Sequence, residues 1–381
     1  MIKYLGSKRT LLPDLVEALG RFPELRSVVD LFSGTSRVGH AFKRAGLRVL
    51  ANDHNAYAHA LARCYVAADR EAVLRDAQRL IGELSALPGR AGYFTQAFCL
   101  DARFFQPKNG ARVDAIRDAI AQKGLPPLLE AVLLVSLMEA ADRVDSTCGL
   151  QMAYLKEWAP RAHNDLELRM PDVLPAVSYG ACEAHCRDAL AALTGPDALE
   201  ADVVYVDPPY NQHSYLSNYH VWETLVRWDR PAYYGVACKR EDCRTRKSAL
   251  NVKGQCLEAF RAIVRAANAK LIVVSFNDEG YLGREQIEQS LGERGEVFVL
   301  TRDFKRYVGA QIGIYDPLGR KVGKVGRLRN REFIYVVATE RASFGRPVAS
   351  ILGDLDGGTP SQCGTEPADA ACSDRVGSSV T

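Results

Sequence analysis

The sequence contains no long run of apolar residues. Its longest apolar stretch, residues 131–137, is too short to cross a bilayer. Residues 1–20 mix basic and acidic side chains without a clean hydrophobic region, so we expect neither a signal peptide nor a membrane span. Without export, the 10 cysteines are expected to be reduced thiols in a cytoplasmic protein rather than a disulfide framework.

The sequence also has no strong excess of one charge. Its net charge is +3 over 381 residues, with 47% apolar and 25% charged residues. This composition is typical of a soluble globular protein with enough apolar material for a core. Such a small net charge gives no argument for nucleic acid binding, so that argument must come from local basic segments.

Several functional signatures are absent. Cys182, His185 and Cys186 lie close together in sequence, as do Cys238 and Cys243, but no second pair at zinc spacing completes either set. We therefore predict no metal site. The sequence has no Walker A motif and no helicase or nuclease signature, which excludes a phosphate-clamping NTPase loop and DNA cleavage by this chain.

The order of apolar runs and helical patterns predicts an α/β fold. Buried-strand patterns occupy residues 27–32, 47–51, 202–206, 271–276, 297–301, 307–315 and 333–338. Helical patterns occupy residues 37–45, 57–84, 111–122 and 127–144. Strands that alternate with helices indicate a mostly parallel sheet covered by helices on both faces.

The spacing of these patterns predicts the domain organisation. About 150 residues separate the second strand from the strand at 202–206, far more than one crossover needs. We expect residues 1–87 and 181–340 to form the two parts of the α/β domain and residues 88–180 to form an inserted helical subdomain. In residues 341–381, 15 of 41 residues are Gly, Pro or Ser, which predicts a disordered tail.

The first motif with chemical meaning is the segment 30–39, DLFSGTSRVG. A strand enters a turn of small residues that opens a helix, so a ligand can approach the backbone and the helix N-terminus. Asp53 follows Gly34 by 19 residues at the end of the next strand, where a carboxylate can accept both hydroxyls of a ribose. Ser36 replaces the second Gly of a dinucleotide fingerprint, so an ordinary strand-to-helix turn is an equal alternative.

The second motif is Asp207-Pro208-Pro209-Tyr210, directly after a buried strand. Two prolines cannot continue a central strand, so they fix a rigid loop at its carboxyl end, where α/β sheets bind ligands. A planar base with an exocyclic amine suits this loop. Asp207 can accept one N–H, the carbonyl of Pro208 can accept the other, and Tyr210 can stack on the ring. A plain strand-ending turn is the alternative, and the upstream motif makes it the weaker one.

These motifs together resemble a known family. The N-terminal segment 3–8 (KYLGSK), the loop 31–35 (LFSGT) and the loop 207–210 (DPPY) are similar to motifs of the D12 class of DNA adenine-N6 methyltransferases, which includes Dam-like enzymes. The likeness covers about residues 1–340 and continues through 146–149, 154–158, 218–220, 275–280 and 307–324. Ser36 departs from the pattern, because many relatives have Gly there.

The resemblance implies a Rossmann-like sheet that binds S-adenosylmethionine as the cofactor. It assigns to this cofactor Tyr4, Gly6, Lys8, Asp30, Phe32, Ser33, Gly34, Thr35, Asp53 and Asp188. Lys8 would lie near the carboxylate of the cofactor's methionine part, Asp53 would hold the ribose hydroxyls, and Asp188 would meet the amino group of the cofactor's adenine.

The resemblance also implies the reaction. The catalytic residues Asp207, Pro208, Pro209 and Tyr210 would receive an adenine flipped out of duplex DNA, and its N6 would attack the methyl group directly and in line. No covalent enzyme intermediate is needed. The sequence agrees, because it contains no Pro-Cys pair of the kind that cytosine-C5 enzymes use for their nucleophile.

Two basic segments are the expected DNA contacts. Residues 239–253 carry a net charge of +4 and residues 305–331 carry +7, although solvated charged loops would look the same. We expect sequence reading in the inserted subdomain, near Trp158. The predicted DNA-binding residues are Lys156, Arg161, Lys239, Arg240, Arg244, Arg246, Lys247, Arg320, Lys321 and Lys324. His213, Tyr219 and His220 follow the catalytic loop and either order it over the base or pack in the core.

The expected partner is double-stranded DNA, bound by a monomer or weak dimer in the cytoplasm of a bacterial or phage-type system. In restriction-modification, cleavage would need a separate restriction endonuclease. The alternatives are an amino methyltransferase that acts on cytosine N4, a base in ribosomal RNA or a protein glutamine, and a catalytically inactive DNA-binding subunit. The N-terminal motif and the insertion favour adenine in DNA, and the intact 207–210 loop argues against the inactive subunit.

Overall fold

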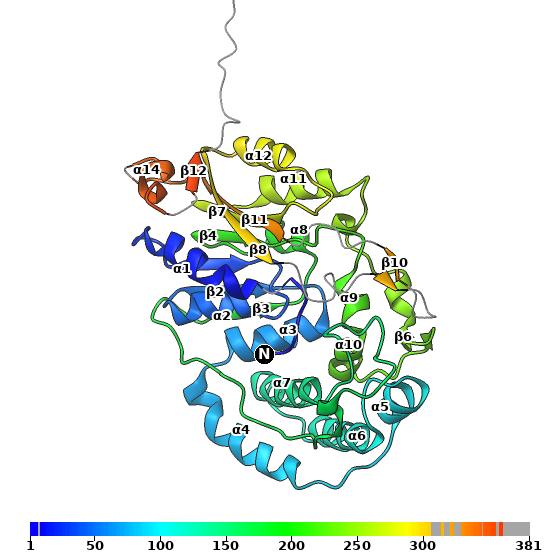
Figure 1. Ribbon diagram of the computed structural model, residues 1–381. Helices are drawn as coiled ribbons and strands as arrows, with labels where there is room; N and C mark the ends of the chain where they lie inside the picture. Colours follow the sequence, from blue (N-terminus) through cyan, green and yellow to red (C-terminus); the bar gives the residue numbers. More distant parts are fainter. Residues whose placement is uncertain are drawn as a thin grey trace, which may run out of the picture.

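The fold is built on one central sheet. The computed structural model describes residues 1–6, 8–305, 314–315, 321–323, 329–344, 346–355 and 358–360. Its eight-stranded sheet has the order β12-β8-β11-β7-β4-β1-β2-β3 (Figure 1). The strands are β1 (Ser27–Asp30), β2 (Arg48–Asn52), β3 (Glu183–His185), β4 (Val203–Val206), β7 (Leu271–Asn277), β8 (Val297–Lys305), β11 (Arg329–Ala338) and β12 (Gly358–Pro360).

The predicted mostly parallel sheet is confirmed. Strands β3, β2, β1, β4 and β7 pair in parallel, so their carboxyl ends lie at one edge of the sheet. Strand β11 runs antiparallel between β7 and β8, and β12 adds an antiparallel edge strand. The chain leaves β1 toward β2 and later returns at β4 on the other side of β1. The gap between β1 and β4 is therefore a topological switch point, where open α/β sheets bind ligands.

Helices cover both faces of the sheet, as the strand pattern predicts. In β7, Ile272 and Val274 pack on one face with α8, α11 and α12, whereas Leu271 and Val273 pack on the other face with α1, α2 and α14. Alternate residues of a strand face opposite sides, which explains the continuous apolar run. These helices are α1 (Leu12–Gly20), α2 (Arg37–Arg44), α8 (Ala189–Leu193), α11 (Cys256–Ala266), α12 (Arg284–Gly292) and α14 (Val348–Leu352).

A further body of helices lies beside the sheet, below it in Figure 1. The helices of this body are α3 (Ala56–Ala62), α4 (Arg70–Ser85), α5 (Tyr93–Thr95), α6 (Pro107–Gln122), α7 (Pro127–Arg143), α9 (Tyr215–Asn218) and α10 (His220–Arg227). The expected helices at 111–122 and 127–144 are thus present as α6 and α7. They share one hydrophobic core with α3, α4 and α10, for example through Leu61, Leu80 and Trp222. The boundaries at residues 87 and 180 stay a prediction.

The expected helix over residues 57–84 is interrupted. Helix α3 leads into a π-helical turn at Arg63–Ala67, and Ala68 is extended. Asp69 then accepts a hydrogen bond from the backbone N–H of Glu71, which begins α4 as a new helix. Asp69 also accepts from the backbone N–H of Ala176, so a distant segment stabilises this break. Local sequence periodicity cannot predict a contact between segments so far apart in the chain.

The predicted disordered tail is wrong for its described part. Residues 341–360 include α14 and β12, and β12 pairs with β8 at the edge of the sheet. Val348 and Leu352 are buried, and Phe344 packs against Phe22 of the main body. These few apolar residues anchor the segment despite its many Gly, Pro and Ser residues. Residues 361–381 lie outside the described residues.

Two short hairpins complete the described fold. One pairs β5 (Tyr233–Tyr234) with β6 (Lys239–Arg240), and the other pairs β9 (Ile314–Tyr315) with β10 (Lys321–Gly323). Of the strand expected at 307–315, only residues 314–315 lie within the described part. None of the described helices is both long enough and apolar enough to span a bilayer.

Candidate functional site

Three carboxylates gather where the parallel strands end. Asp30 is the last residue of β1, Asp53 follows β2, and Asp207 follows β4. Asp30 is in register with Ala51 of β2 and with Tyr205 of β4, so all three acids lie at the same edge of the sheet. The strands thereby place both sequence motifs at the switch point between β1 and β4.

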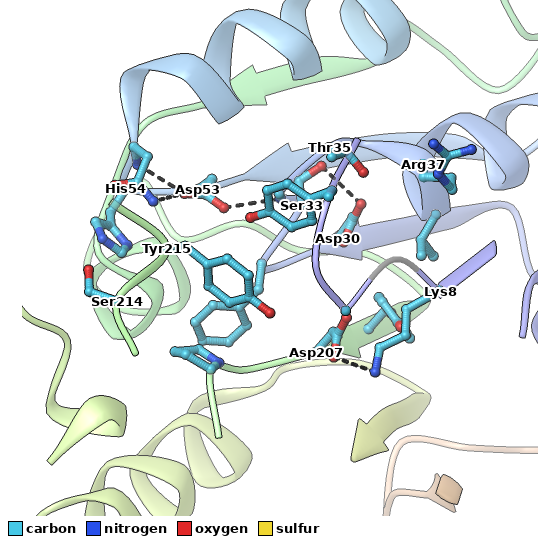
Figure 2. A pocket seen from close by; sticks show the side chains of 18 of the residues that line it. Lys8, Asp30, Ser33, Thr35, Arg37, Asp53, His54, Asp207, Ser214 and Tyr215 are labelled. Carbon is cyan, nitrogen blue, oxygen red and sulfur yellow. Dashed lines mark hydrogen bonds and ion pairs between the residues drawn. The ribbon is translucent and has the colours of Figure 1, made fainter. Parts of the chain in front are cut away.

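One pocket joins the motifs (Figure 2). Its empty volume is ≈ 700 Å³, which includes the part that is open to solvent. Its lining contains eleven of the predicted site residues, which are Tyr4, Gly6, Lys8, Asp30, Phe32, Ser33, Gly34, Thr35, Asp53, Asp207 and Pro209. The three motifs, far apart in the chain, therefore meet at one cavity.

Asp30 organises the loop that leads into α2. One of its oxygens, Oδ2, accepts hydrogen bonds from the hydroxyl of Ser33 (3.0 Å) and the backbone N–H of Gly39 (3.1 Å). A Cβ at Gly39 would lie 2.9 Å from the same oxygen, so only glycine allows this close approach. The other oxygen, Oδ1, is buried without a partner among the described residues. Burial is the main cause that raises the pKa of Asp30 to about 7.

Ser36 adopts a conformation that favours glycine. Its φ of 58° lies in the left-handed region, directly before α2 begins. The side chain is buried, and its hydroxyl bonds with the hydroxyl of Ser33 at 3.1 Å. The departure from the family pattern at Ser36 therefore keeps the backbone turn and adds one hydrogen bond, at the cost of some strain.

Asp53 ties the ends of two strands together. Its Oδ2 accepts from the backbone N–H of Gly34 (3.0 Å), and its Oδ1 accepts from the backbone N–H (2.9 Å) and the side-chain amide (3.1 Å) of Asn55. Each carboxylate oxygen can accept more than one hydrogen bond. The carboxylate of Asp53 is thus fixed in the pocket wall and retains capacity for a ligand's hydroxyl groups.

Lys8 lies between two carboxylates at the opposite end of the pocket. Its ammonium group is 3.2 Å from Asp207 and 3.0 Å from Glu332 of β11, and only 6% of its side chain is exposed. Burial raises the pKa of Asp207 to about 6, with Lys8 opposing this shift and Glu332 adding to it. The two acids raise the pKa of Lys8 far above its usual value against the effect of burial, so Lys8 remains a cation.

Tyrosines form one wall of the pocket. The ring of Tyr4 stacks against both Tyr215 (5.2 Å) and Tyr219 (4.5 Å), and its hydroxyl bonds with that of Tyr57. The hydroxyl of Tyr219 accepts a hydrogen bond from the backbone N–H of Leu5. This contact attaches the N-terminal motif to the segment after the 207–210 loop. It explains how so short a segment becomes part of the site.

Three predicted residues do not line this pocket. Asp188 is exposed and caps α8 by accepting from the backbone N–H groups of Leu190 and Ala191. Pro208 is buried beneath the loop. The ring of Tyr210 packs edge-on against Phe276, and its backbone carbonyl accepts a hydrogen bond from the backbone N–H of Tyr281. The roles of these residues stay predictions.

The sequence reasoning missed several residues at the pocket. They are Arg37, Val38, His54, Asn55, Tyr205, Ser214, Tyr215 and Asn251. Arg37 and Val38 follow the first motif, and His54 and Asn55 follow Asp53, so proximity to the motifs could have indicated them. Glu332 carried no local signal, because it reaches Lys8 only through the antiparallel pairing of β11 with β7.

Part of the predicted DNA-binding set is corrected by its contacts. The guanidinium of Arg240 is only 3% exposed and pairs with Asp229 (2.6 Å) and Asp242 (3.0 Å), which leaves it no surface for a phosphate. Arg246 joins Glu223 (3.0 Å) to the carbonyl of His54 (3.2 Å). Both residues stabilise the fold, and their charges are already neutralised.

The remaining predicted DNA residues are more accessible. Lys156, Arg244 and Lys247 are exposed, whereas Lys239 is half-buried beside the sulfur of Met152. Arg161 is tied to Asp145 by two hydrogen bonds of 2.7 and 2.9 Å, so it also has a structural role. Arg320 and Lys324 lie outside the described residues. Lys321 begins β10.

Burial distinguishes the two roles considered for His220 and Tyr219. His220 is fully buried and shares a hydrogen bond with the carbonyl of Gln151, and burial lowers its pKa to about 3. His220 and Tyr219 therefore pack in the core, whereas His213 is exposed. Within the described part of the chain, no cluster of three His, Cys, Asp or Glu side chains has an arrangement that could hold a metal ion.

Comparison with known proteins gives a consistent result. The family model of the D12 class N6 adenine-specific DNA methyltransferases matches residues 4–286. Type II methyltransferase M.NlaIII of Neisseria lactamica is 28% identical over 80% of this chain and 92% of its own length. Modification methylase StsI of Streptococcus sanguinis is 29% identical over 77% of the chain. Type II methyltransferase M.FokI of Planomicrobium okeanokoites is 30% identical over the same share.

These relatives differ in length. The chain spans 46% of modification methylase StsI and 47% of M.FokI, about half of each, but nearly all of M.NlaIII. The family match runs through every motif of the pocket, from Tyr4 to Asp207, and includes the helical segment between them. On this match, the chain belongs to the D12 class N6 adenine-specific DNA methyltransferase family.

Proposed function

We propose that this chain transfers a methyl group from S-adenosylmethionine to N6 of an adenine at a specific site in duplex DNA. The main support for this proposal is that the loop after Asp30 and the loop at 207–210 both border one pocket. A donor and an acceptor of a methyl group must meet within one cavity for direct transfer. Family membership supports both the donor class and adenine as the target.

The polar groups that line the pocket match the polar groups of S-adenosylmethionine. Asp53, at one end, can bind the ribose hydroxyls. Asp30 and Arg37, nearer the other end, each have a buried polar atom without a partner among the described residues, which suits the charged methionine part. A Cβ at Gly34 would lie 3.3 Å from the hydroxyl of Tyr4, so glycine keeps this space open. When bound, S-adenosylmethionine supplies an electrophilic methyl group on a cationic sulfur.

Asp207 and Pro208 activate the target amine. The lone pair of an aromatic amine is delocalised into the ring, which makes the nitrogen a poor nucleophile. When Asp207 and the carbonyl of Pro208 accept its two N–H groups, the nitrogen becomes pyramidal and its lone pair points to the methyl group. The nitrogen would take the methyl group as its bond to sulfur breaks, S-adenosylhomocysteine would leave, and the proton that the amine releases would pass to solvent. No residue forms a covalent bond to the base.

Lys8 is the natural counter-ion during this step. In the structure it is shared between Asp207 and Glu332. When the target amine donates its hydrogen bond to Asp207, the contact between Lys8 and Asp207 weakens. Lys8 still contacts Glu332, so it does not become an unpaired buried charge. Glu332 thereby allows Asp207 to replace Lys8 with the target amine as its hydrogen-bond donor.

The base must leave the duplex to reach this pocket. Asp207 is only 20% exposed, at the bottom of a cavity that a stacked base cannot enter. We propose that the adenine flips out and stacks on Tyr210, while exposed basic residues such as Lys156, Arg244 and Lys247 contact the DNA backbone. Duplex DNA is the proposed partner of a monomer or weak dimer in the cytoplasm of a bacterial or phage-type system, with a separate restriction endonuclease for cleavage.

The assignment is tested by methyl transfer from labelled S-adenosylmethionine. The purified chain is incubated with duplex DNA, ribosomal RNA or a protein mixture, and the labelled product is digested and identified. We expect the label in N6-methyladenine from duplex DNA. Label in N4-methylcytosine, ribosomal RNA or glutamine would contradict the substrate assignment, and label in none of them would favour an inactive DNA-binding subunit.

A further inference from the structure

Two arginines meet at the end of the pocket that is distant from Asp53. Arg37 lines the main pocket and also both outer grooves beside it, and Arg9 lines the same two grooves. Figure 2 shows Arg37 on the side of Lys8, whereas Asp53 and His54 lie on the other side. The Nε of Arg37 is buried and has no hydrogen-bond partner among the described residues. A buried guanidinium nitrogen without a partner is costly unless a ligand supplies one.

The two arginines have no direct acidic partner. Within the described part of the chain, neither Arg9 nor Arg37 forms an ion pair. Burial lowers the pKa of Arg37 and repulsion by Arg9 adds to this, whereas the nearby carboxylate of Glu139 opposes it. The nearby acids have other partners. Of the acids that line the adjoining groove, Glu17 pairs with Arg21 and Asp172 pairs with Arg44. Glu139, close to Arg37, accepts from the N-terminal amine and from Tyr65.

Lys8, the cation that the family resemblance places near the cofactor carboxylate, is already engaged. It contacts both Asp207 and Glu332, so two negative charges neutralise it. A third carboxylate beside it would be repelled by both. Arg37 is the other cationic residue in the described lining of the pocket.

We propose that Arg37, with Arg9 behind it, binds the α-carboxylate of the methionine part of S-adenosylmethionine, in place of Lys8. The inference rests on the proposed function. Asp30 lies at the same end of the pocket with one unpartnered oxygen, so this end carries both charges that an α-amino acid group requires. A DNA phosphate is the weaker occupant, because the free Nε of Arg37 is buried whereas a duplex remains at the surface.

The test compares two ligands in the absence of DNA. Calorimetry measures the binding of S-adenosylmethionine and of its decarboxylated form, which differs only in the missing α-carboxylate. We expect Arg37→Ala to weaken S-adenosylmethionine binding by about 10- to 100-fold, the usual range for a hydrogen bond to a charged group. Binding of the decarboxylated ligand should change less than about threefold, which also shows that the pocket is folded. Arg37→Lys should give an intermediate loss.

Arg44→Ala is the matched control. Arg44 is also an arginine of α2, but it pairs with Asp172 and does not line the main pocket, so both ligands should bind as in the wild type. Unchanged binding of S-adenosylmethionine to Arg37→Ala would overturn the inference. An equal loss for both ligands would overturn it too. A wild type that binds neither ligand would overturn the cofactor assignment itself and this inference with it.

Discussion

Lys8 is the residue on which the charge balance of the catalytic loop depends. The proposed transfer needs Asp207 as a carboxylate, and burial raises the pKa of this carboxyl to about 6. We therefore predict that kcat/KM for DNA falls as the pH drops through about 6, because Asp207 then takes up a proton. Lys8→Gln removes the cation that lowers this pKa and should move the acid limb to higher pH. Glu332→Gln removes an anion that raises it and should move the limb to lower pH.

The pH dependence of kcat/KM, measured at saturating cofactor, checks this prediction. Asp30 also titrates in this range, since its pKa is raised to about 7. The variants distinguish the two groups, because Lys8 and Glu332 directly contact each other and Lys8 contacts Asp207. Shifts of the limb in the same direction for both variants would contradict the assignment to Asp207.

Substitution of Ser36 measures the free-energy cost of a serine in the left-handed backbone region. Ser36→Gly should relieve about 1 kcal/mol of backbone strain. It should also lose the hydroxyl bond to Ser33, worth about 1 kcal/mol, and add freedom to the unfolded chain. We therefore expect the free energy of unfolding to change by less than about 1 kcal/mol in urea denaturation. A loss of several kcal/mol would show that the hydroxyl bonds are worth much more than the strain.

At the residue scale, the sequence was most informative where a motif had a rigid backbone. The motifs at 3–8, 30–39 and 207–210, together with Asp53 and the family resemblance that they carry, predicted eleven residues of the pocket lining. It failed at Arg240 and Arg246, because a count of charges does not show which acids neutralise them. Their partners Asp229 and Glu223 reach them only through the folding of α10 and the β5–β6 hairpin.

At the scale of elements, Arg246 connects α10 to the pocket. Glu223 on α10 is fully buried, and Arg246 joins it to the carbonyl of His54 in the pocket wall. Arg246→Ala would leave the buried carboxylate of Glu223 with only the longer contact to Arg227 (3.9 Å), so we predict a loss of about 2–3 kcal/mol in the free energy of unfolding.

Arg244→Ala provides the control for this measurement. Arg244 is exposed, two residues away, and pairs only with exposed Glu241 in the described salt bridges, so its loss should cost less than about 0.5 kcal/mol. Urea denaturation followed by circular dichroism gives both values. Equal stabilities for the two variants would contradict a structural role of Arg246.

The elements that the sequence mispredicted share one cause. The helix over 57–84 breaks where Asp69 accepts a hydrogen bond from Ala176, and Phe344 packs against Phe22 of the main body shortly before α14 begins. Each contact joins segments more than 100 residues apart. Local periodicity and composition do not contain such contacts, whereas they correctly predicted α6, α7 and the core strands β1, β4 and β7.

At the scale of the whole molecule, the net charge of +3 conceals how few of the predicted cations are accessible. We predict that Lys247→Ala reduces the slope of log K against log salt for DNA binding by about 1, because one exposed cation releases one fewer counter-ion. Arg240→Ala should leave this slope unchanged, since Arg240 is buried. Fluorescence anisotropy with a labelled duplex at several salt concentrations measures both, and a reduced slope for Arg240→Ala alone would contradict the assignment.

The central claim is that one pocket brings the methyl donor and an adenine amine together at Asp207. The most direct test measures labelled methyl transfer to N6 of adenine in duplex DNA by the wild type and by Asp207→Ala, with calorimetric cofactor binding measured on both proteins. The account predicts that Asp207→Ala loses methyl transfer while it still binds S-adenosylmethionine, because Asp53 and the loop after Asp30 remain intact. Wild-type activity in Asp207→Ala would contradict it.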